Sequence, residues 1–207
     1  MENPWRGIPL TDYESHMELP QVAQAKLLAE ELGAVLTRYA PDSIAVLGCA
    51  GGNGFDRIAA AATPRVVGVD INASYIEAAR VRFAARVPVL ELYVADLARD
   101  RLDFAPVDLI YCALLLEYVD PQTLLPKMRA ALRPGGRLVT LIQLRSNDST
   151  AVTPSPFVSL GVLASMMRLV APDELESLAR VSGFEPVVSR THAADGGKCF
   201  QLQVFAT

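Results

Sequence analysis

The sequence predicts an α/β fold built on a doubly wound, mostly parallel sheet, and three observations predict it. Apolar runs of strand length alternate with segments of helical periodicity through the middle of the chain. The run at residues 44–47 enters a glycine-rich turn, and the next run ends in Asp70. Hydrophobic residues make up 51% of the 207 residues, which is enough to cover both faces of such a sheet.

The expected elements follow in chain order. A capping-box pattern predicts a short helix that starts at Asp12, and Pro20 opens a longer helix whose apolar positions run to Tyr39. Strands are then expected at residues 44–47, 65–70, 87–94, 107–112, 137–144, 187–190 and 199–205. Helices are expected at residues 55–61, 73–85 and 121–132, and from Pro172 to a stop at Gly183. Residues 145–156 have a loop composition. The stretch 157–170 is apolar, and its part 157–167 fits either a core helix or a cover over a site.

Composition argues against several classes of protein. The net charge of −4 disfavours bulk electrostatic binding to nucleic acid. Three cysteines, none in a CxxC pair, give neither a disulfide framework nor a metal site, and they favour a reducing compartment. The N-terminus shows no signal-peptide pattern, and the longest apolar run is shorter than the about 20 residues that span a bilayer. We therefore expect one cytoplasmic domain that binds no nucleic acid, membrane or metal, and the sequence leaves the oligomeric state open.

The turn from Gly48 to Gly54 predicts a nucleoside pocket. Glycines let a ligand approach the backbone, the following helix would offer unpaired N–H groups, and Asp70 would accept hydrogen bonds from two ribose hydroxyls. A dinucleotide needs the pattern G-x-G-x-x-G, but counting from Gly48 gives Ala50 and Asn53 in place of the second and third glycines. S-adenosylmethionine carries no pyrophosphate, so a pocket for it does not require the third glycine.

Five motifs in order resemble those of the class I S-adenosylmethionine-dependent methyltransferases over residues 44–207. They are the loop Gly48-x-Ala50-x-Gly52 and the segments 67–71, 95–97, 110–113 with 116–119, and 132–138. The chain departs from the family at Ala50, where the family's loop has its middle glycine, and at Val46, where an acidic residue is frequent. The resemblance implies a Rossmann-like, seven-stranded sheet with an antiparallel C-terminal strand and an N-terminal helical lid. It also implies a single domain, 1–207, with a helical cap at 1–40, a cofactor-binding core at 41–207 and a substrate cover at 145–171.

The resemblance further implies how the cofactor S-adenosylmethionine binds. Asp70 would bind the ribose hydroxyls and Ile71 would pack on the adenine. Asp96 would accept a hydrogen bond from the exocyclic amine, and the Leu97 N–H would serve a ring nitrogen. Asp70 and Asp96 could instead only cap the helices that follow them, and the cysteines could be core residues. The cofactor-binding residues that we expect are Gly48, Cys49, Ala50, Gly52, Asp70, Ile71, Asp96, Leu97, Cys112 and Ala113.

Three residues are candidates for a catalytic role by the same resemblance. Tyr13 and His16 precede the first domain helix, where family members often fold a lid over the cofactor, and Tyr118 follows the fourth strand, where the transferred methyl should point. His16 would be the general base if the acceptor needs one, and the tyrosine faces would stabilise the sulfonium. The alternative for each of the three is ordinary packing.

The expected reaction is in-line displacement that transfers the methyl group to a small-molecule acceptor. Residues 112–115 lack the Asn/Asp-Pro-Pro-Tyr pattern of enzymes that methylate amino groups of nucleic acids. Two alternatives stay open. One is a regulatory or partner protein that binds S-adenosylmethionine without turnover, and the other is an NAD-dependent oxidoreductase.

Overall fold

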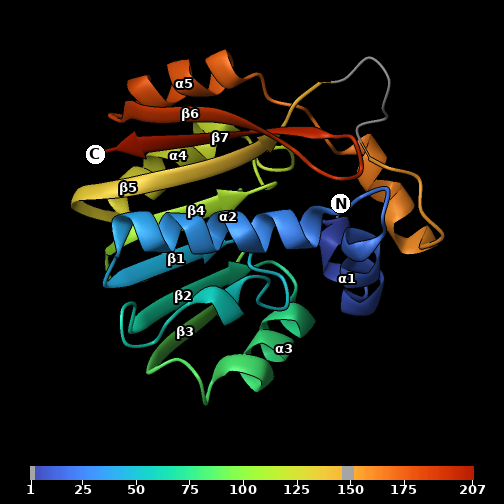
Figure 1. The fold of residues 1–207 in the computed structure, drawn as a ribbon, viewed down its shortest axis with the longest axis horizontal. Coiled ribbons are helices and arrows are strands. Elements are labelled where there is room, and N and C mark those ends of the chain that lie inside the picture. Colours follow the sequence, from blue (N-terminus) through green and yellow to red (C-terminus); the bar gives the residue numbers. More distant parts are fainter. Residues whose placement is uncertain (1–2, 146–151) are drawn as a thin grey trace.

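Seven strands form one sheet in the computed structural model, which describes residues 3–145 and 152–207. The strands are β1 (Ser43–Leu47), β2 (Arg65–Asp70), β3 (Val89–Val94), β4 (Val107–Ala113), β5 (Leu132–Gln143), β6 (Glu185–Ala193) and β7 (Cys199–Ala206). Their spatial order is β3-β2-β1-β4-β5-β7-β6 (Figure 1). Neighbours are parallel except that β7 runs antiparallel to both β5 and β6. This confirms the predicted Rossmann-like, mostly parallel sheet with an antiparallel C-terminal strand.

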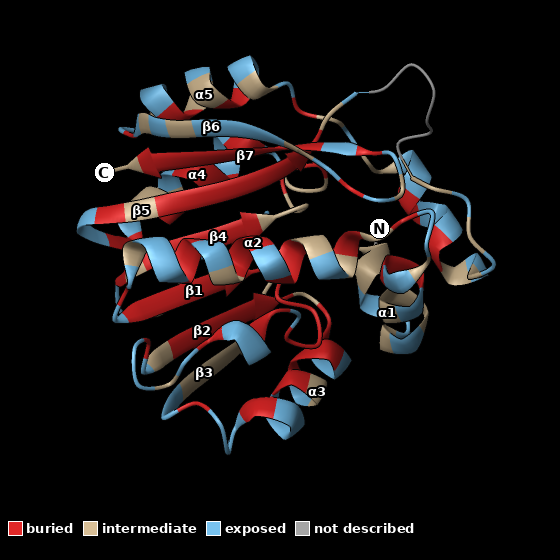
Figure 2. Cartoon of the chain, in the orientation of Figure 1, coloured by how far each residue is buried: buried red, intermediate tan, exposed pale blue. Residues whose placement is uncertain are grey.

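Helices cover both faces of the sheet. They are α1 (Leu10–Glu18), α2 (Gln24–Tyr39), α3 (Ala73–Phe83), α4 (Pro121–Ala130) and α5 (Pro172–Val181), with the short 3-10 helices η1 (Pro4–Gly7), η2 (Phe55–Arg57) and η3 (Val158–Ser165). Ile44 and Val46 of β1 pack in the cluster that includes α2, whereas Ala45 and Leu47 pack in the cluster that includes α4 and α5. Because successive strand side chains point to opposite faces, one strand contributes to two cores. β1 is accordingly buried along its whole length (Figure 2). In the described residues no helix is both long and apolar enough to cross a membrane.

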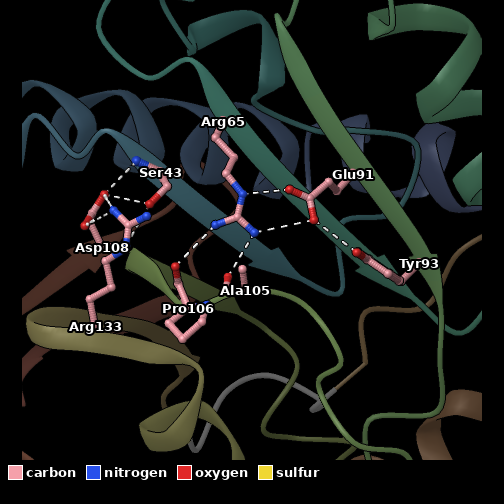
Figure 3. A network of polar contacts seen from close by, with 8 residues as sticks. All are labelled: Ser43, Arg65, Glu91, Tyr93, Ala105, Pro106, Asp108 and Arg133. Carbon is pink, nitrogen blue, oxygen red and sulfur yellow. Dashed lines mark hydrogen bonds and ion pairs between the residues drawn. The ribbon is translucent and has the colours of Figure 1, made fainter.

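A polar network ties together the amino-terminal ends of the strands (Figure 3). Asp108 of β4 accepts hydrogen bonds from Ser43 Oγ at 2.6 Å and from Arg133 Nη1 at 2.9 Å. Arg65 of β2 pairs with Glu91 of β3 at 2.6 Å, and this contact lowers the pKa of Glu91. Ion pairs and hydrogen bonds therefore fix one edge of the sheet, opposite the carboxyl edge where ligands bind in such folds.

The helix expected at residues 55–61 does not form, and the prediction was wrong there. Only η2, a single 3-10 turn of three residues, follows the glycine turn. Gly52 and Gly54 both take positive φ angles, at +89° and +80°, and Ile58 is already extended. The left-handed glycines and the approach to Pro64 leave too little regular backbone for an α-helix.

Several other boundaries differ from the prediction. The longer N-terminal helix begins at Gln24 rather than near Pro20, because a turn at residues 20–22 and the left-handed Ala23 separate it from α1. The fifth strand begins at Leu132, so the turn expected before it lies within β5 as an irregularity with Gly135 at φ +77°. The apolar stretch 157–170 contains η3 rather than a core α-helix. The ends of the remaining elements agree with the prediction to within three residues, and β2 coincides with it.

Candidate functional site

A cavity lies at the carboxyl edge of the sheet, where β1, β2 and β4 end and the chain leaves β3. Gly48, Ala50, Asp70, Asp96 and Leu97 line it, together with Ile71 and Ala113. In the strand order, β1 leads toward β2 on one side and lies against β4 on the other, so the cavity sits at the switch point of the sheet. We call it the first cavity.

Asp70 holds the glycine turn in place. The residue is 8% exposed, its Oδ2 accepts the Ala50 N–H at 2.9 Å, and its Oδ1 accepts the Asn72 N–H at 2.9 Å. Burial raises the pKa of Asp70, and these N–H groups partly offset that effect. Val46 is buried in the core, so Asp70 supplies the polar support of the turn. A carboxylate has about four acceptor positions, so Asp70 can also accept a hydrogen bond from a ligand.

Ala50 occupies the place of the family's middle glycine in a left-handed conformation, with φ +47°. Such a conformation costs an alanine roughly 1 kcal/mol that a glycine would not lose. The hydrogen bond from its N–H to Asp70 helps to hold the strained residue. Ala50 therefore stands in the place of the family's glycine and still adopts the left-handed backbone conformation that is typical of glycine.

Asp96 combines the two roles that the sequence left as alternatives. Its Oδ1 accepts the Ala98 N–H at 3.1 Å, as a turn-capping aspartate does, and the residue is 8% exposed and also lines the first cavity. Leu97 beside it is buried, with its carbonyl accepting from Lys127 Nζ at 2.9 Å. Lys127 thus fixes the segment that would face an adenine ring.

Aromatic side chains form the wall of the first cavity that faces the N-terminal segment. Tyr13 stacks on Tyr75 with ring centroids 5.9 Å apart, and Trp5 meets Tyr118 edge to face at 5.1 Å. The Tyr75 hydroxyl is buried and has no hydrogen-bond partner among the described residues. A buried, unsatisfied hydroxyl beside the Asp70 carboxylate fits a polar ligand such as an adenosine derivative.

Three of the residues expected to bind the cofactor do not line the first cavity. Cys112 is fully buried in the core, and the Cys49 thiol donates to the Ala50 carbonyl at 3.6 Å. Burial raises the pKa of both thiols, so neither is a ready nucleophile. Gly52 borders a neighbouring cavity under α1, where a Cβ would collide with the Phe83 ring. The described residues include no group of three or more His, Cys, Asp or Glu that could hold a metal ion.

A second cavity adjoins the first, and four residues line both: Trp5, Tyr13, Leu114 and Tyr118. We call these four residues the shared wall. Leu114 has φ +52°, a left-handed conformation that is costly for leucine, and its N–H donates to the Leu141 carbonyl at 2.8 Å. This strained residue lies where a group would pass between the two cavities.

His16 lines the second cavity and not the first. It is 9% exposed, and its Nδ1 has no partner among the residues that the structure describes. Burial and the positive charge of Lys198 lower the pKa of His16, so its imidazole is neutral at pH 7. Burial raises the pKa of Tyr13 and Tyr118. The two phenols therefore stay protonated, and His16 is the available base.

Three sets of hydrogen bonds hold the N-terminal segment, residues 3–18, over the first cavity. Asn72, which also caps α3, donates through Nδ2 to the Trp5 carbonyl at 2.9 Å and the Ile8 carbonyl at 3.1 Å. Arg82 of α3 pairs with Glu14 of α1 through both guanidinium nitrogens. Ser159 Oγ of η3 donates to Asp12 Oδ2 at 2.6 Å. Of the segment expected as a cap, residues 3–18 lie near the cavities, whereas α2 packs along the sheet (Figure 1).

Sequence reasoning missed several residues of the two cavities. Tyr75 of the first cavity is hidden in the helical pattern of α3, and Lys198 of the second stands in what reads as a loop. Asn72, which holds the N-terminal segment without lining either cavity, reads only as a helix cap. The substrate cover expected at residues 145–171 lies partly outside the described residues, at 146–151. Its described part contributes Leu160, Leu163 and Met167 to the second cavity.

Known proteins resemble this chain in sequence over its middle part. A family described as a methyltransferase domain matches residues 44–136. A trans-aconitate 2-methyltransferase from Methylobacterium radiotolerans is 38% identical over 121 residues, which is 58% of this chain and 44% of that protein. The chain spans less than half the length of the curated relatives that it matches.

Solved structures share the fold along most of the chain. The N-methyltransferase NodS from Bradyrhizobium japonicum, solved with S-adenosyl-L-homocysteine, has a TM-score of 0.66 at 18% identity, covering 89% of this chain and 87% of that one. The cyclase SpnF has a TM-score of 0.67 at 13% identity, covering 89% and 82%. Residues 44–136 thus match a methyltransferase domain, and the strand order and the solved structures show that the chain has the fold of these proteins.

Proposed function

We propose that this protein transfers the methyl group of S-adenosylmethionine to a small-molecule acceptor. The observation that carries the proposal is the first cavity, where Asp70 and Asp96 from the ends of two adjacent strands face the same space as the turn at Gly48. Two carboxylates set apart along a sheet edge suit the ribose and the adenine amine of one nucleoside. Ile71 and Leu97 would lie along the adenine between them.

The shared wall supports methyl transfer rather than binding alone. When bound, S-adenosylmethionine supplies a methyl group made electrophilic by its sulfonium. The contribution of this chain is to hold an acceptor in the second cavity in line with that methyl and to exclude water with the N-terminal segment. Such positioning contributes on the order of 7–11 kcal/mol in well-oriented systems. Tyr13 and Tyr118 present neutral rings at the boundary, and rings of this kind stabilise a cation.

His16 is proposed as the proton acceptor for an acceptor that arrives protonated. Its imidazole is neutral, it faces the second cavity, and it lies one helical turn from Tyr13 of the shared wall. Cys49, Cys112 and Gly52 are then proposed to shape the turn and the strands beneath the cofactor, without lining the first cavity.

An NAD-dependent oxidoreductase is disfavoured by the backbone after the glycine turn. A pyrophosphate binds at the N-terminus of an α-helix in dinucleotide folds, and only the three residues of η2 are helical here. A cofactor-binding protein without turnover remains the main alternative, because one fold (here also that of a cyclase) hosts different activities.

The experiment is incubation of the purified protein with methyl-labelled S-adenosylmethionine and a fractionated metabolite extract. Label in a small organic product supports the proposal, and an unlabelled extract with normal cofactor binding supports the alternative. The relatives named trans-aconitate 2-methyltransferase make organic acids the first fractions to examine. The cytoplasmic location expected from the cysteine pattern stays a prediction.

A further inference from the structure

Tyr75 is a buried phenol at the first cavity. It lies in the first turn of α3, it lines the cavity, and the residue is 1% exposed. Asp70 ends β2 shortly before it in the chain and lines the same cavity. The connection from β2 to α3 therefore brings a carboxylate and a phenol to one edge of the sheet.

The ring of Tyr75 is held in position from two sides. Its N–H donates to the Asn72 carbonyl at 3.1 Å, and its ring stacks on Tyr13 of α1 with centroids 5.9 Å apart and planes 29° apart. Asn72 also donates to the Trp5 and Ile8 carbonyls, so the same residue holds the N-terminal segment that carries Tyr13. A ring packed in this way keeps its hydroxyl away from solvent, and the hydroxyl must find its partner inside the site.

The hydroxyl of Tyr75 has no hydrogen-bond partner in the part of the chain that the structure describes. Burial raises the pKa of Tyr75, and the nearby Tyr13 and Asp70 raise it further, so the phenol keeps its proton and can donate. The Asp70 oxygens accept the Ala50 and Asn72 N–H groups, and neither is bonded to Tyr75. A buried donor without an acceptor is rare in native proteins, and it indicates a ligand atom as the partner.

The charge of Asp70 restricts which ligand atom Tyr75 can serve. A second carboxylate beside Asp70 would be repelled, whereas a neutral hydroxyl can donate to Asp70 and accept from Tyr75 at the same time. A ribose offers two such hydroxyls on neighbouring carbons. We propose that Tyr75 donates a hydrogen bond to a ribose hydroxyl oxygen of the cofactor, an inference that rests on the placement of the nucleoside in the proposed function above.

This role makes Tyr75 a residue that determines specificity for the sugar. Asp70 alone recognises a hydroxyl only as a donor, and Tyr75 adds recognition of the same group as an acceptor. It also gives the phenol opposite effects on folding and on binding. In the free protein the unpartnered hydroxyl destabilises the fold, and in the complex it contributes to affinity.

The test compares Tyr75→Phe with the wild type by calorimetry and by thermal unfolding. The probes are S-adenosylhomocysteine and its two deoxy forms, each of which lacks one ribose hydroxyl. We expect Tyr75→Phe to bind S-adenosylhomocysteine about tenfold more weakly than the wild type does. For one of the deoxy forms the two proteins should bind equally, because that ligand lacks the oxygen that Tyr75 serves. The Tm of the ligand-free variant should equal or exceed that of the wild type.

Tyr39→Phe is the matched control, because Tyr39 lies at the end of α2 and lines neither the first nor the second cavity. It should bind S-adenosylhomocysteine as the wild type does.

Three results would overturn the inference. They are an affinity of Tyr75→Phe for S-adenosylhomocysteine within about twofold of the wild type, an equal weakening for all three ligands, and a ligand-free Tm below that of the wild type. The last result would show that the hydroxyl has a partner in the folded chain itself. Failure of S-adenosylhomocysteine to bind the wild type would instead overturn the proposed function.

Discussion

Glu117 should destabilise the protein above neutral pH, and its replacement by glutamine should remove that cost. The residue is 2% exposed, and its Oε2 is buried without a partner among the described residues. Burial raises the pKa of Glu117 from 4.5 to about 7, although Oε1 accepts the Gln143 N–H. A raised pKa gives stability that is fully present below pH 4.5 and is lost as the pH rises through about 7.

The size of the effect follows from that difference in pKa. Ionisation of Glu117 lowers the free energy of unfolding by about 3 kcal/mol at pH 8 and by about 1 kcal/mol at pH 5, relative to a glutamate that stays neutral. Glu117→Gln keeps an oxygen for the Gln143 N–H and carries no charge. The variant should therefore be more stable than the wild type at pH 8, and the gain should shrink by about 2 kcal/mol at pH 5.

Urea unfolding of the cofactor-free protein at pH 5 and pH 8 measures this, with Glu18→Gln as the control at an exposed site. The control should change stability by less than about 0.5 kcal/mol at either pH. A stability difference for Glu117→Gln that does not vary with pH, or a variant less stable than the wild type at pH 8, would refute the reasoning.

Three further predictions concern the two edges of the sheet. Asp70→Ala should weaken S-adenosylhomocysteine binding in calorimetry by about 1–3 kcal/mol and also lower the Tm, because the Ala50 N–H loses its acceptor; unchanged affinity would remove Asp70 from the site. His16→Ala should reduce turnover more than cofactor affinity, and wild-type values of both would contradict its role as a base. Arg65→Met should cost about 1 kcal/mol of stability without changing cofactor affinity. Because Arg65 lowers the pKa of Glu91, the part of this cost due to the ion pair should be present above pH 4.5 and be lost in acid, whereas the part due to the Ala105 and Pro106 carbonyls should persist. A cost that does not fall between pH 7 and pH 2 would contradict the ion pair.

Local signals explain how far the sequence could predict the fold. The continuous apolar run of β1 and the carboxylate that ends β2 are signals carried by neighbouring residues, so the sheet and the position of Asp70 follow from the sequence. The failed helix at residues 55–61 shows the limit, because its alanines favour a helix while two left-handed glycines and Pro64 set the backbone. Tertiary context overrides propensity in such a short connection.

Residues that meet only in the folded chain escape sequence reasoning. Lys198 lies more than 180 residues from His16 along the chain, and only the close packing of Gly196 on residues 21 and 22 brings the two together. The hydrogen bonds of Asn72 to the N-terminal segment likewise join elements with no common periodicity. The first cavity could thus be foreseen from motifs, whereas the second depends on contacts between distant segments.

The most direct test of the central claim is a crystal structure of the protein soaked with S-adenosylhomocysteine. The account predicts the nucleoside in the first cavity, with its ribose hydroxyls donating to Asp70 and its adenine beside Asp96. Density for the ligand elsewhere, or an empty first cavity at saturating ligand, would contradict it.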